Sequence, residues 1–185
     1  MASYFTADWH LNERRIGDIR TGCFNPFFRP FRSVTEQNDR IIDGLNSVVR
    51  PTDRLYVVGD VAIDREGVSL LDRIHCRNRT LIIGNYDTDK LDALASTFDA
   101  VVDQLELEIA GVPCLLQHYP ARAVKDRFNI VGHIHGLWKV RPNMVNVGVD
   151  AWHFLPVSEQ EIRFVYDAMR TGKYDENVFP IGRGV

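Results

Sequence analysis

The first half of the chain alternates between short apolar runs and stretches whose apolar residues recur at helical spacing. Three apolar runs predict buried strands over residues 4–7, 55–58 and 80–83. Ser33 and Glu36 form the Ser-x-x-Glu pattern that begins a helix, and the apolar residues that follow as far as Val49 share one helical face. Two further helices are expected near residues 68–74 and 91–98.

The second half is richer in strands that follow one another closely. Leucine and isoleucine alternate with glutamate over residues 105–109, which indicates a half-exposed strand. Ala110-Gly111 supplies a turn into the apolar run 112–117, so these residues predict a hairpin. Two more strands are expected over residues 128–131 and 144–147.

The end of the chain carries a second helix-start signal. Ser158 and Glu161 repeat the capping pattern before a last amphipathic helix, which Gly172 ends. Residues 173–185 are expected to form a surface tail. Because no repeat or linker divides the sequence, residues 1–185 are predicted to form one layered α/β domain, with a mixed sheet or two sheets.

Composition narrows the possible classes of protein. Of 185 residues, 45% are hydrophobic and 25% are charged, which excludes collagen-like, coiled-coil and wholly disordered chains. The net charge of −3 argues against a dedicated nucleic-acid coat. Cys23, Cys76 and Cys114 are far apart and form no Cys-x-x-Cys pair, so a disulfide framework or a thiolate zinc site is not expected.

The sequence offers no membrane or export signal. The first residues lack a basic region followed by a long apolar stretch, so we do not expect them to form a secretory signal. No apolar run approaches the roughly 20 residues that a membrane span needs. We therefore expect a cytoplasmic protein with no membrane partner.

Polar side chains that can bind metal follow five of the predicted strands directly. They lie in the segments Asp8-Trp9-His10, Gly59-Asp60, Gly84-Asn85-Tyr86-Asp87, His118-Tyr119-Pro120 and Gly132-His133-Ile134-His135-Gly136. Ligands of open α/β sheets bind at the carboxyl ends of the strands. Alternate residues of an extended segment point the same way, so Asp8 can converge with His10 and His133 can converge with His135.

These side chains indicate a metal site with two ions. Each segment alone is common in loops, but five in this order at strand ends are hard to explain as coincidence. Imidazole and carboxylate ligands without thiolates suit manganese, iron, zinc or nickel rather than calcium alone. Seven ligand-type residues exceed the needs of one ion, so we expect two divalent ions that share a ligand.

The order of the segments resembles that of the calcineurin-like metallophosphoesterases. Their motifs are Asp-x-His, Gly-Asp, Gly-Asn-His-Asp/Glu, a single His, and Gly-His-x-His. The resemblance runs from Tyr4 to about Ser158 and looks closest to small bacterial and phage members, which share stretches like residues 46–49, 118–120 and 146–150. It implies a two-sheet (αββα) sandwich with flanking helices, and hydrolysis of phosphate esters.

The resemblance also implies a role for each matching residue. The implied metal ligands are Asp8, His10 and His135 for one ion, Asn85, His118 and His133 for the other, and Asp60 as the bridge. Manganese is the expected metal, with iron, zinc and nickel as alternatives. Two ions roughly 3.5–4 Å apart can bind a phosphoryl oxygen, provide a bridging hydroxide as nucleophile and stabilise an in-line transition state.

One position departs from the family pattern. Tyr86 stands where the family has a histidine that assists the leaving group. Because a phenol is a weaker acid than an imidazolium, phosphodiesters, nucleotide-type substrates and esters with good leaving groups are favoured over alkyl monoesters. The candidate catalytic residues are Asp60, Asn85, Tyr86 and His153, the last as a replacement acid.

Basic residues are candidates for binding substrate phosphate. They are Arg14, Arg15 and Arg29 in the long loop, and Arg122 after the His118 segment, of which Arg29 and Arg122 are taken as the substrate-binding candidates. The long aromatic segment 17–32 is expected to form one wall of the substrate pocket.

Two other functions remain open at this stage. One is a phosphomonoesterase that acts on a small metabolite or nucleotide. The other is a non-catalytic binding module that keeps the fold as a scaffold, like the retromer subunit of the same superfamily. The sequence does not determine the oligomeric state.

Overall fold

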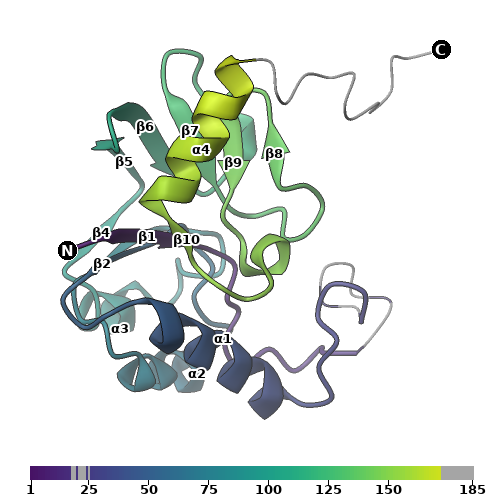
Figure 1. Ribbon diagram of the computed structural model, residues 1–185. Coiled ribbons are helices and arrows are strands. Elements are labelled where there is room, and N and C mark those ends of the chain that lie inside the picture. The colour runs from purple at the N-terminus through teal and green to yellow at the C-terminus, as the bar shows by residue number, and fades with distance from the viewer. Residues whose placement is uncertain (18–19, 21–23, 25, 172–185) are drawn as a thin grey trace.

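A computed structural model describes residues 1–17, 20, 24 and 26–171, and Figure 1 shows two five-stranded sheets with helices around them. The first sheet has the order β10-β1-β2-β3-β4 and the second has the order β5-β6-β7-β9-β8. The expected fold class, a two-sheet α/β sandwich with flanking helices, is confirmed. Residues 172–185, with Gly172 and the expected tail, lie outside the described residues.

The first sheet is mostly parallel. Its strands are β1 (Ser3–Thr6), β2 (Arg54–Val57), β3 (Arg79–Ile82), β4 (Ala100–Val102) and β10 (Val157–Ser158). Strands β1 to β4 are parallel to one another, and β10 pairs antiparallel with β1. The carboxyl ends of β1, β2 and β3 therefore open on the same edge.

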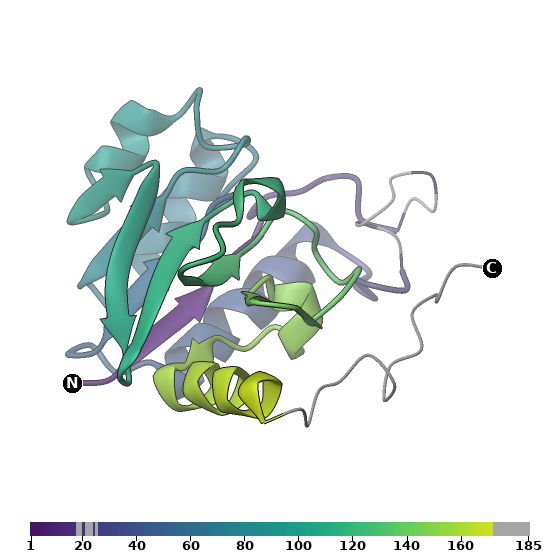
Figure 2. The same cartoon turned by 90° about the horizontal axis from the view of Figure 1, so that it is seen from above.

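The second sheet begins with the predicted hairpin. Its strands are β5 (Gln104–Ile109), β6 (Val112–Gln117), β7 (Phe128–Val131), β8 (Val140–Arg141) and β9 (Met144–Asn146). Strands β5 and β6 are antiparallel, whereas β6, β7 and β9 are parallel. Seen from above, this sheet and α4 lie over the first sheet (Figure 2).

The helices lie on the outside of this pair of sheets. They are α1 (Val34–Val48), α2 (Arg65–Ser69), α3 (Leu91–Ala95) and α4 (Glu159–Arg170), with short 3₁₀ turns η2 (Leu70–Arg73), η3 (Pro120–Arg122) and η4 (Val149–Trp152). The helix expected over residues 68–74 is thus split between α2 and η2. None of the helices in the described part of the chain is long and apolar enough to span a membrane.

The helix-start signals are confirmed with one difference. In α4, Ser158 and Glu161 satisfy each other's backbone N–H groups as a capping box. In α1, the Ser33 hydroxyl accepts from the Glu36 N–H, but the Glu36 carboxylate accepts from the backbone of Arg32 instead of Ser33. That box is therefore only half formed.

Strand β2 shows how the two sides of the first sheet are used. Leu55 and Val57 face the helices and belong to one buried cluster, whereas Tyr56 and Val58 belong to the cluster between the sheets. This alternation follows from the two-residue period of a strand. Both faces are buried, so the sheet is held firmly at the place where its carboxyl edge carries the polar side chains.

The two sheets meet at that edge. Ala7, directly after β1, forms a parallel bridge with Gly148, which follows β9. A Cβ added at Gly132, after β7, would lie 2.7 Å from the Ala7 Cβ and 2.8 Å from the Val58 carbonyl oxygen. A side chain at Gly132 would therefore separate the ends of the strands, and the site depends on their close approach.

Candidate metal centre

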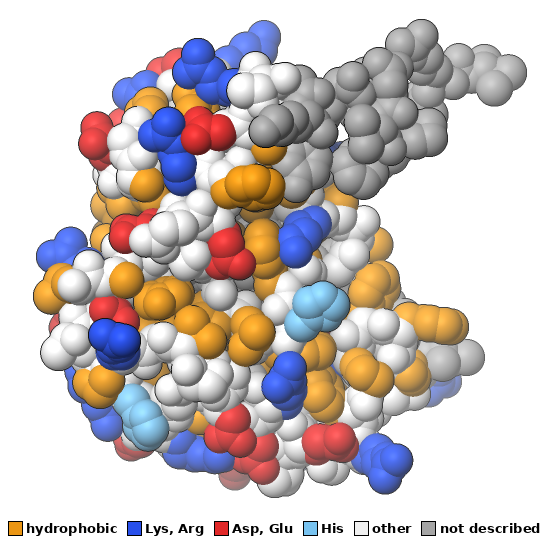
Figure 3. Space-filling model, in the orientation of Figure 1, with side chains coloured by type: hydrophobic (Ala, Val, Ile, Leu, Met, Phe, Trp, Pro, Cys, Tyr) orange, Lys and Arg blue, Asp and Glu red, His pale blue; other side chains and the backbone are white. Residues whose placement is uncertain are grey.

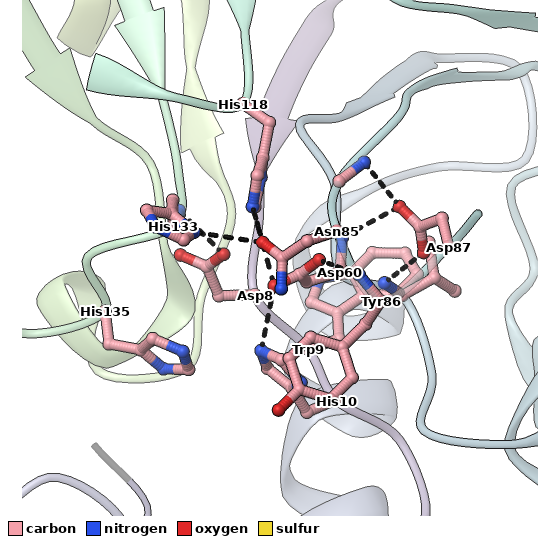
Figure 4. Close-up of polar contacts among 12 residues, drawn as sticks. Asp8, Trp9, His10, Asp60, Asn85, Tyr86, Asp87, His118, His133 and His135 are labelled. Atoms are coloured by element: carbon pink, nitrogen blue, oxygen red, sulfur yellow. Dashed lines mark hydrogen bonds and ion pairs between the residues drawn. The ribbon is translucent and has the colours of Figure 1, made fainter. Parts of the chain in front are cut away.

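The polar side chains after the strands gather into two clusters (Figure 4). The first cluster comprises Asp8, His10 and His135, and the second comprises Asp60, His118 and His133. Within each cluster, one ligand-type atom from each residue lies within 4.8 Å of the others. These residues follow β1, β2, β6 and β7, so both sheets contribute to the site.

Asp60 lies between the clusters. Its Oδ2 is 3.4 Å from Nε2 of His10 and 3.5 Å from Nε2 of His118, while Oδ1 accepts a 2.8 Å bond from the Tyr86 N–H. Burial raises the pKa of this carboxyl group, but the two histidines outweigh that effect and hold it well below its ordinary value. One carboxylate oxygen therefore faces one histidine from each cluster.

Asn85, which follows β3, completes the second cluster from its exposed side. Its Oδ1 lies 3.2 Å from Nε2 of His118 and 3.0 Å from Nδ1 of His133. The other nitrogen of His118 lies 2.8 Å from the Val58 carbonyl oxygen, which can only accept, so Nδ1 carries a proton. When the ring is neutral, the lone pair of Nε2 points towards the Asp60 and Asn85 oxygens, which also carry lone pairs. A cation bound among these atoms would replace their repulsion by attraction.

The first cluster contains buried polar atoms without partners. Among the described residues, four buried side-chain nitrogen and oxygen atoms lack a hydrogen bond, and three of them are here: Asp8 Oδ2 and both ring nitrogens of His10. The approach of His10 Nε2 to Asp60 is an ion-pair distance and not a hydrogen bond. Because unpaired buried polar atoms are costly, these atoms fit a cation that would use them as ligands.

Burial also changes the protonation of the first cluster. It raises the pKa of Asp8 to about 6 and lowers the pKa of His10 to about 4. His10 is therefore neutral near pH 7, the form that binds a metal.

His135 is oriented by a carboxylate that the sequence analysis did not single out. Its Nδ1 lies 2.9 Å from Oδ2 of Asp150, and its ring stacks on the His10 ring at 4.9 Å between centroids. The signal was present in the sequence, because Asp150 ends the stretch 146–150 on which the resemblance partly rests.

The backbone around the ligand-type residues is unusual. Five of them have left-handed φ angles: Asp8 at 59°, His10 at 46°, Asp60 at 59°, His133 at 74° and His135 at 50°. Non-glycine residues pay an energetic cost in this region, and such strain concentrates at functional sites. The surrounding structure must therefore impose these conformations.

Asp87 imposes part of this geometry. Its buried carboxylate accepts hydrogen bonds from the backbone N–H groups of Asp60, Val61 and Gly84, at 2.8–2.9 Å. A Cβ added at Gly84 would lie 2.4 Å from Oδ1 of Asp60. Asp87 was noted in its motif but not as a site residue, and its role is to fix the turn that presents Asp60.

Two other candidates lie beside the clusters. The Tyr86 ring meets the His10 ring edge-on at 4.7 Å, and its Oη accepts a 3.2 Å hydrogen bond from Arg15. The exposed Arg122 guanidinium lies 4.7 Å from the centre of the Tyr119 ring. That ring in turn lies 4.9 Å from the His133 ring, so Arg122 borders the second cluster.

Two predicted site residues are corrected by the structure. Arg29 is fully buried and bonded to protein groups, so it is not available to grip substrate phosphate. His153 has an exposed side chain and belongs to neither cluster, and its carbonyl oxygen accepts a hydrogen bond from Arg40 of α1. Arg14 is also turned away, because it pairs with Asp64 and Glu66.

The predicted pocket wall over residues 17–32 is only partly described, because residues 18–19, 21–23 and 25 lie outside the described set. Within the described part, the Phe24 ring lies 4.9 Å from the His10 ring and 5.3 Å from the His135 ring. The segment therefore contacts the first cluster through an aromatic side chain.

Comparison with solved structures gives a likeness that extends over most of the chain. No protein-family model and no curated protein matches the sequence. A protein of unknown function from Aquifex aeolicus is similar in structure, with 25% identity, a TM-score of 0.66, and coverage of 88% of this chain and 98% of that chain. The phosphoesterase Yfce from E. coli has 14% identity, coverage of 80% and 78%, and a TM-score of 0.49.

A novel archaeal phosphodiesterase has 14% identity, coverage of 80% and 82%, and a TM-score of 0.45. The two packed sheets and the order of the strand-end segments agree with the resemblance seen in the sequence. The fold is a two-sheet α/β sandwich with flanking helices.

Cation binding is predicted to weaken below about pH 6, because a proton then competes for Asp8. The folded, metal-free protein holds this proton more tightly than the unfolded chain does, since burial raises the pKa from 3.8 to about 6. The stability that Asp8 contributes is therefore present at low pH and lost as the pH rises through about 6. A cation would restore it, so Mn²⁺ should raise Tm more at about pH 7.5 than at about pH 5.

Thermal unfolding with and without Mn²⁺ at the two pH values measures this effect. Asp8→Asn is the matched control, and its Mn²⁺-induced shift in Tm should be smaller and depend less on pH. Equal shifts at both pH values in the wild-type protein would contradict the prediction.

Proposed function

We propose that the protein is a metal-dependent phosphoesterase whose two side-chain clusters hold two divalent cations. The observation that carries the proposal is the position of Asp60, whose Oδ2 lies 3.4 Å from His10 and 3.5 Å from His118. A carboxylate in this position can serve both cations at once. Phosphate-ester hydrolysis is the chemistry that most needs two adjacent positive charges.

The proposed ligands use every member of the two clusters. They are Asp8, His10 and His135 for one cation, Asn85, His118 and His133 for the other, and Asp60 for both. The bound cations would neutralise phosphoryl charge and make water nucleophilic near neutral pH. Nitrogen and oxygen donors without thiolates suit manganese, with iron, zinc or nickel as alternatives.

Substrate would enter over the exposed side of the second cluster. Asn85 and His133 are the exposed members of the site, whereas the first cluster is buried. The Asn85 Oδ1 faces the two histidines, which leaves its amide N–H groups able to donate to a phosphate oxygen. Arg122, on the same side, can add a charged contact to the ester.

Tyr86 favours phosphodiesters or nucleotide-type substrates. Its Oη accepts a hydrogen bond from Arg15, so the phenol proton is free to be donated elsewhere. This makes Tyr86 a hydrogen-bond donor to substrate oxygen rather than a strong acid. Alkyl monoesters, whose leaving group needs a delivered proton, are then the poorer substrates.

Asp60→Asn is predicted to lower Mn²⁺-dependent hydrolysis of an aryl phosphodiester by roughly 100-fold or more, because the variant removes a charge that both cations use. Turnover and bound Mn²⁺ are measured together. The matched control is Asp92→Asn, which changes an exposed carboxylate paired with Arg65. A variant at Asp60 that keeps more than about a tenth of wild-type turnover would contradict the proposal.

Tyr86→His is predicted to raise activity on alkyl monoesters relative to diesters, because imidazole supplies a better general acid near neutral pH. Tyr86→Phe is the control and should change aryl-ester turnover little. The ratio of kcat/KM between an alkyl monoester and a diester measures the effect. A wild-type protein that already hydrolyses alkyl monoesters faster than diesters would support the phosphomonoesterase alternative instead.

A further inference from the structure

Arg29 is a fully buried cation whose hydrogen bonds are all made inside the protein. Its Nε and Nη2 donate to the two carboxylate oxygens of Asp150, at 2.8 Å and 3.0 Å. Its Nη1 donates to the Trp9 carbonyl oxygen at 2.9 Å and to the Gln37 side chain at 3.0 Å, and Nη2 also donates to the Asp8 carbonyl oxygen. These five bonds match the five N–H groups of a guanidinium.

Hydrogen bonds connect Arg29, directly or through one partner, to every ligand-type residue of the first cluster. Asp8 is bonded directly through its carbonyl oxygen. His10 is reached through Gln37, whose Nε2 donates to the His10 carbonyl oxygen at 3.1 Å. His135 is reached through Asp150, whose Oδ2 lies 2.9 Å from its Nδ1. Within the described part of the chain, the hydrogen bonds of Arg29 thus converge on the first cluster and not on the second.

Asp150 determines which nitrogen of His135 carries the proton. Both of its carboxylate oxygens accept hydrogen bonds from the Arg29 guanidinium, at 2.8 Å and 3.0 Å, which favours the charged carboxylate. A carboxylate can only accept, so the Nδ1 that faces it holds a proton. In the neutral ring, Nε2 then keeps the lone pair that a metal ion needs.

A gain in folding stability does not by itself explain why this ion pair is buried. Removing two charges from water costs about as much as their attraction returns, so apolar residues of similar size often stabilise a protein as well or better. Both side chains of the Arg29–Asp150 pair are fully buried. The pair therefore fits a role in holding the geometry of the neighbouring cluster.

We propose that Arg29 and Asp150 form a positioning pair that fixes the tautomer and orientation of His135 and so sets the cation affinity of the first cluster alone. Neither residue touches substrate; both act through His135, Asp8 and His10. The proposal rests on the proposed function, because it takes the first cluster to be a cation site.

Three variants test the proposed pair. Asp150→Asn keeps the shape of the side chain but removes its charge and replaces one of its two acceptor oxygens by an N–H donor. Arg29→Met removes the cation. The double variant Arg29→Met/Asp150→Leu replaces both charges by apolar groups, which avoids an unpaired buried charge and keeps the test valid if Arg29→Met does not fold.

Arg79→Met is the matched control. Arg79 is also buried, and it donates to the carbonyl oxygens of Leu71 and Thr97. It begins β3, at the end of the strand away from the site. Its loss should therefore lower stability without changing the first cluster specifically.

Two measurements read out the effect. Equilibrium titration with Mn²⁺ alone gives the number of ions bound and the affinity of each, and nitrogen-15 NMR of the histidine rings in metal-free protein gives the tautomer of His135. We expect two ions in wild type and in the control, and Nδ1-protonated His135. In the three variants we expect one ion unchanged, the other weakened by about 10- to 100-fold, and loss of the single tautomer.

The possible failures are distinguishable. A wild-type protein that binds no Mn²⁺ would overturn the proposed function itself. Two ions in wild type, with variants that keep both affinities and the His135 tautomer, would overturn the positioning pair alone. The positioning pair would also be overturned if the variants bound both ions more weakly to the same extent, in proportion to their loss of stability. A merely structural role would give that result, and Arg79→Met would then show it as well.

Discussion

The carboxylate of Asp60 joins two groups of histidine and aspartate side chains that would otherwise be separate. Its Oδ2 faces His10 on one side and His118 on the other, and its Oδ1 is held by the Tyr86 N–H. The Asp60 backbone is fixed in turn by the carboxylate of Asp87. The position of this one side chain therefore decides whether the two clusters share a ligand-type oxygen.

The pairing of the strands brings Asp60 close to the ligand-type residues that follow β1. The parallel strands β1 and β2 end side by side, so Asp8 donates its N–H to the Gly59 carbonyl oxygen and His10 donates to the Asp60 carbonyl oxygen. The second sheet brings His118 and His133 to the same edge. Acidic and basic side chains are interspersed on the face of the molecule shown in Figure 3.

The site's donors were predictable from the sequence, because a ligand pair at positions i and i+2 after an apolar run needs only strand geometry to converge. The partners that hold them were not predictable. Arginine side chains are mostly exposed, and only the tertiary structure shows that Arg29 is buried against Asp150. For the same reason its expected role as a substrate contact was wrong.

Fold prediction failed where an element depends on its neighbours. Strands β4 and β10 are three and two residues long, too short to show a period, and they exist because β3 and β1 offer them a pairing edge. The longer hairpin β5–β6 was predictable because its alternation and its turn are local. Local signals thus predicted the sheets' main strands, and long-range pairing supplied the rest.

The central claim, two cations that share Asp60, is tested most directly by diffraction from crystals grown with Mn²⁺, at a wavelength where manganese scatters anomalously. The account predicts two anomalous peaks, one among Asp8, His10 and His135 and the other among Asn85, His118 and His133, with Asp60 in contact with both. A single peak, or two peaks without Asp60 between them, would contradict it.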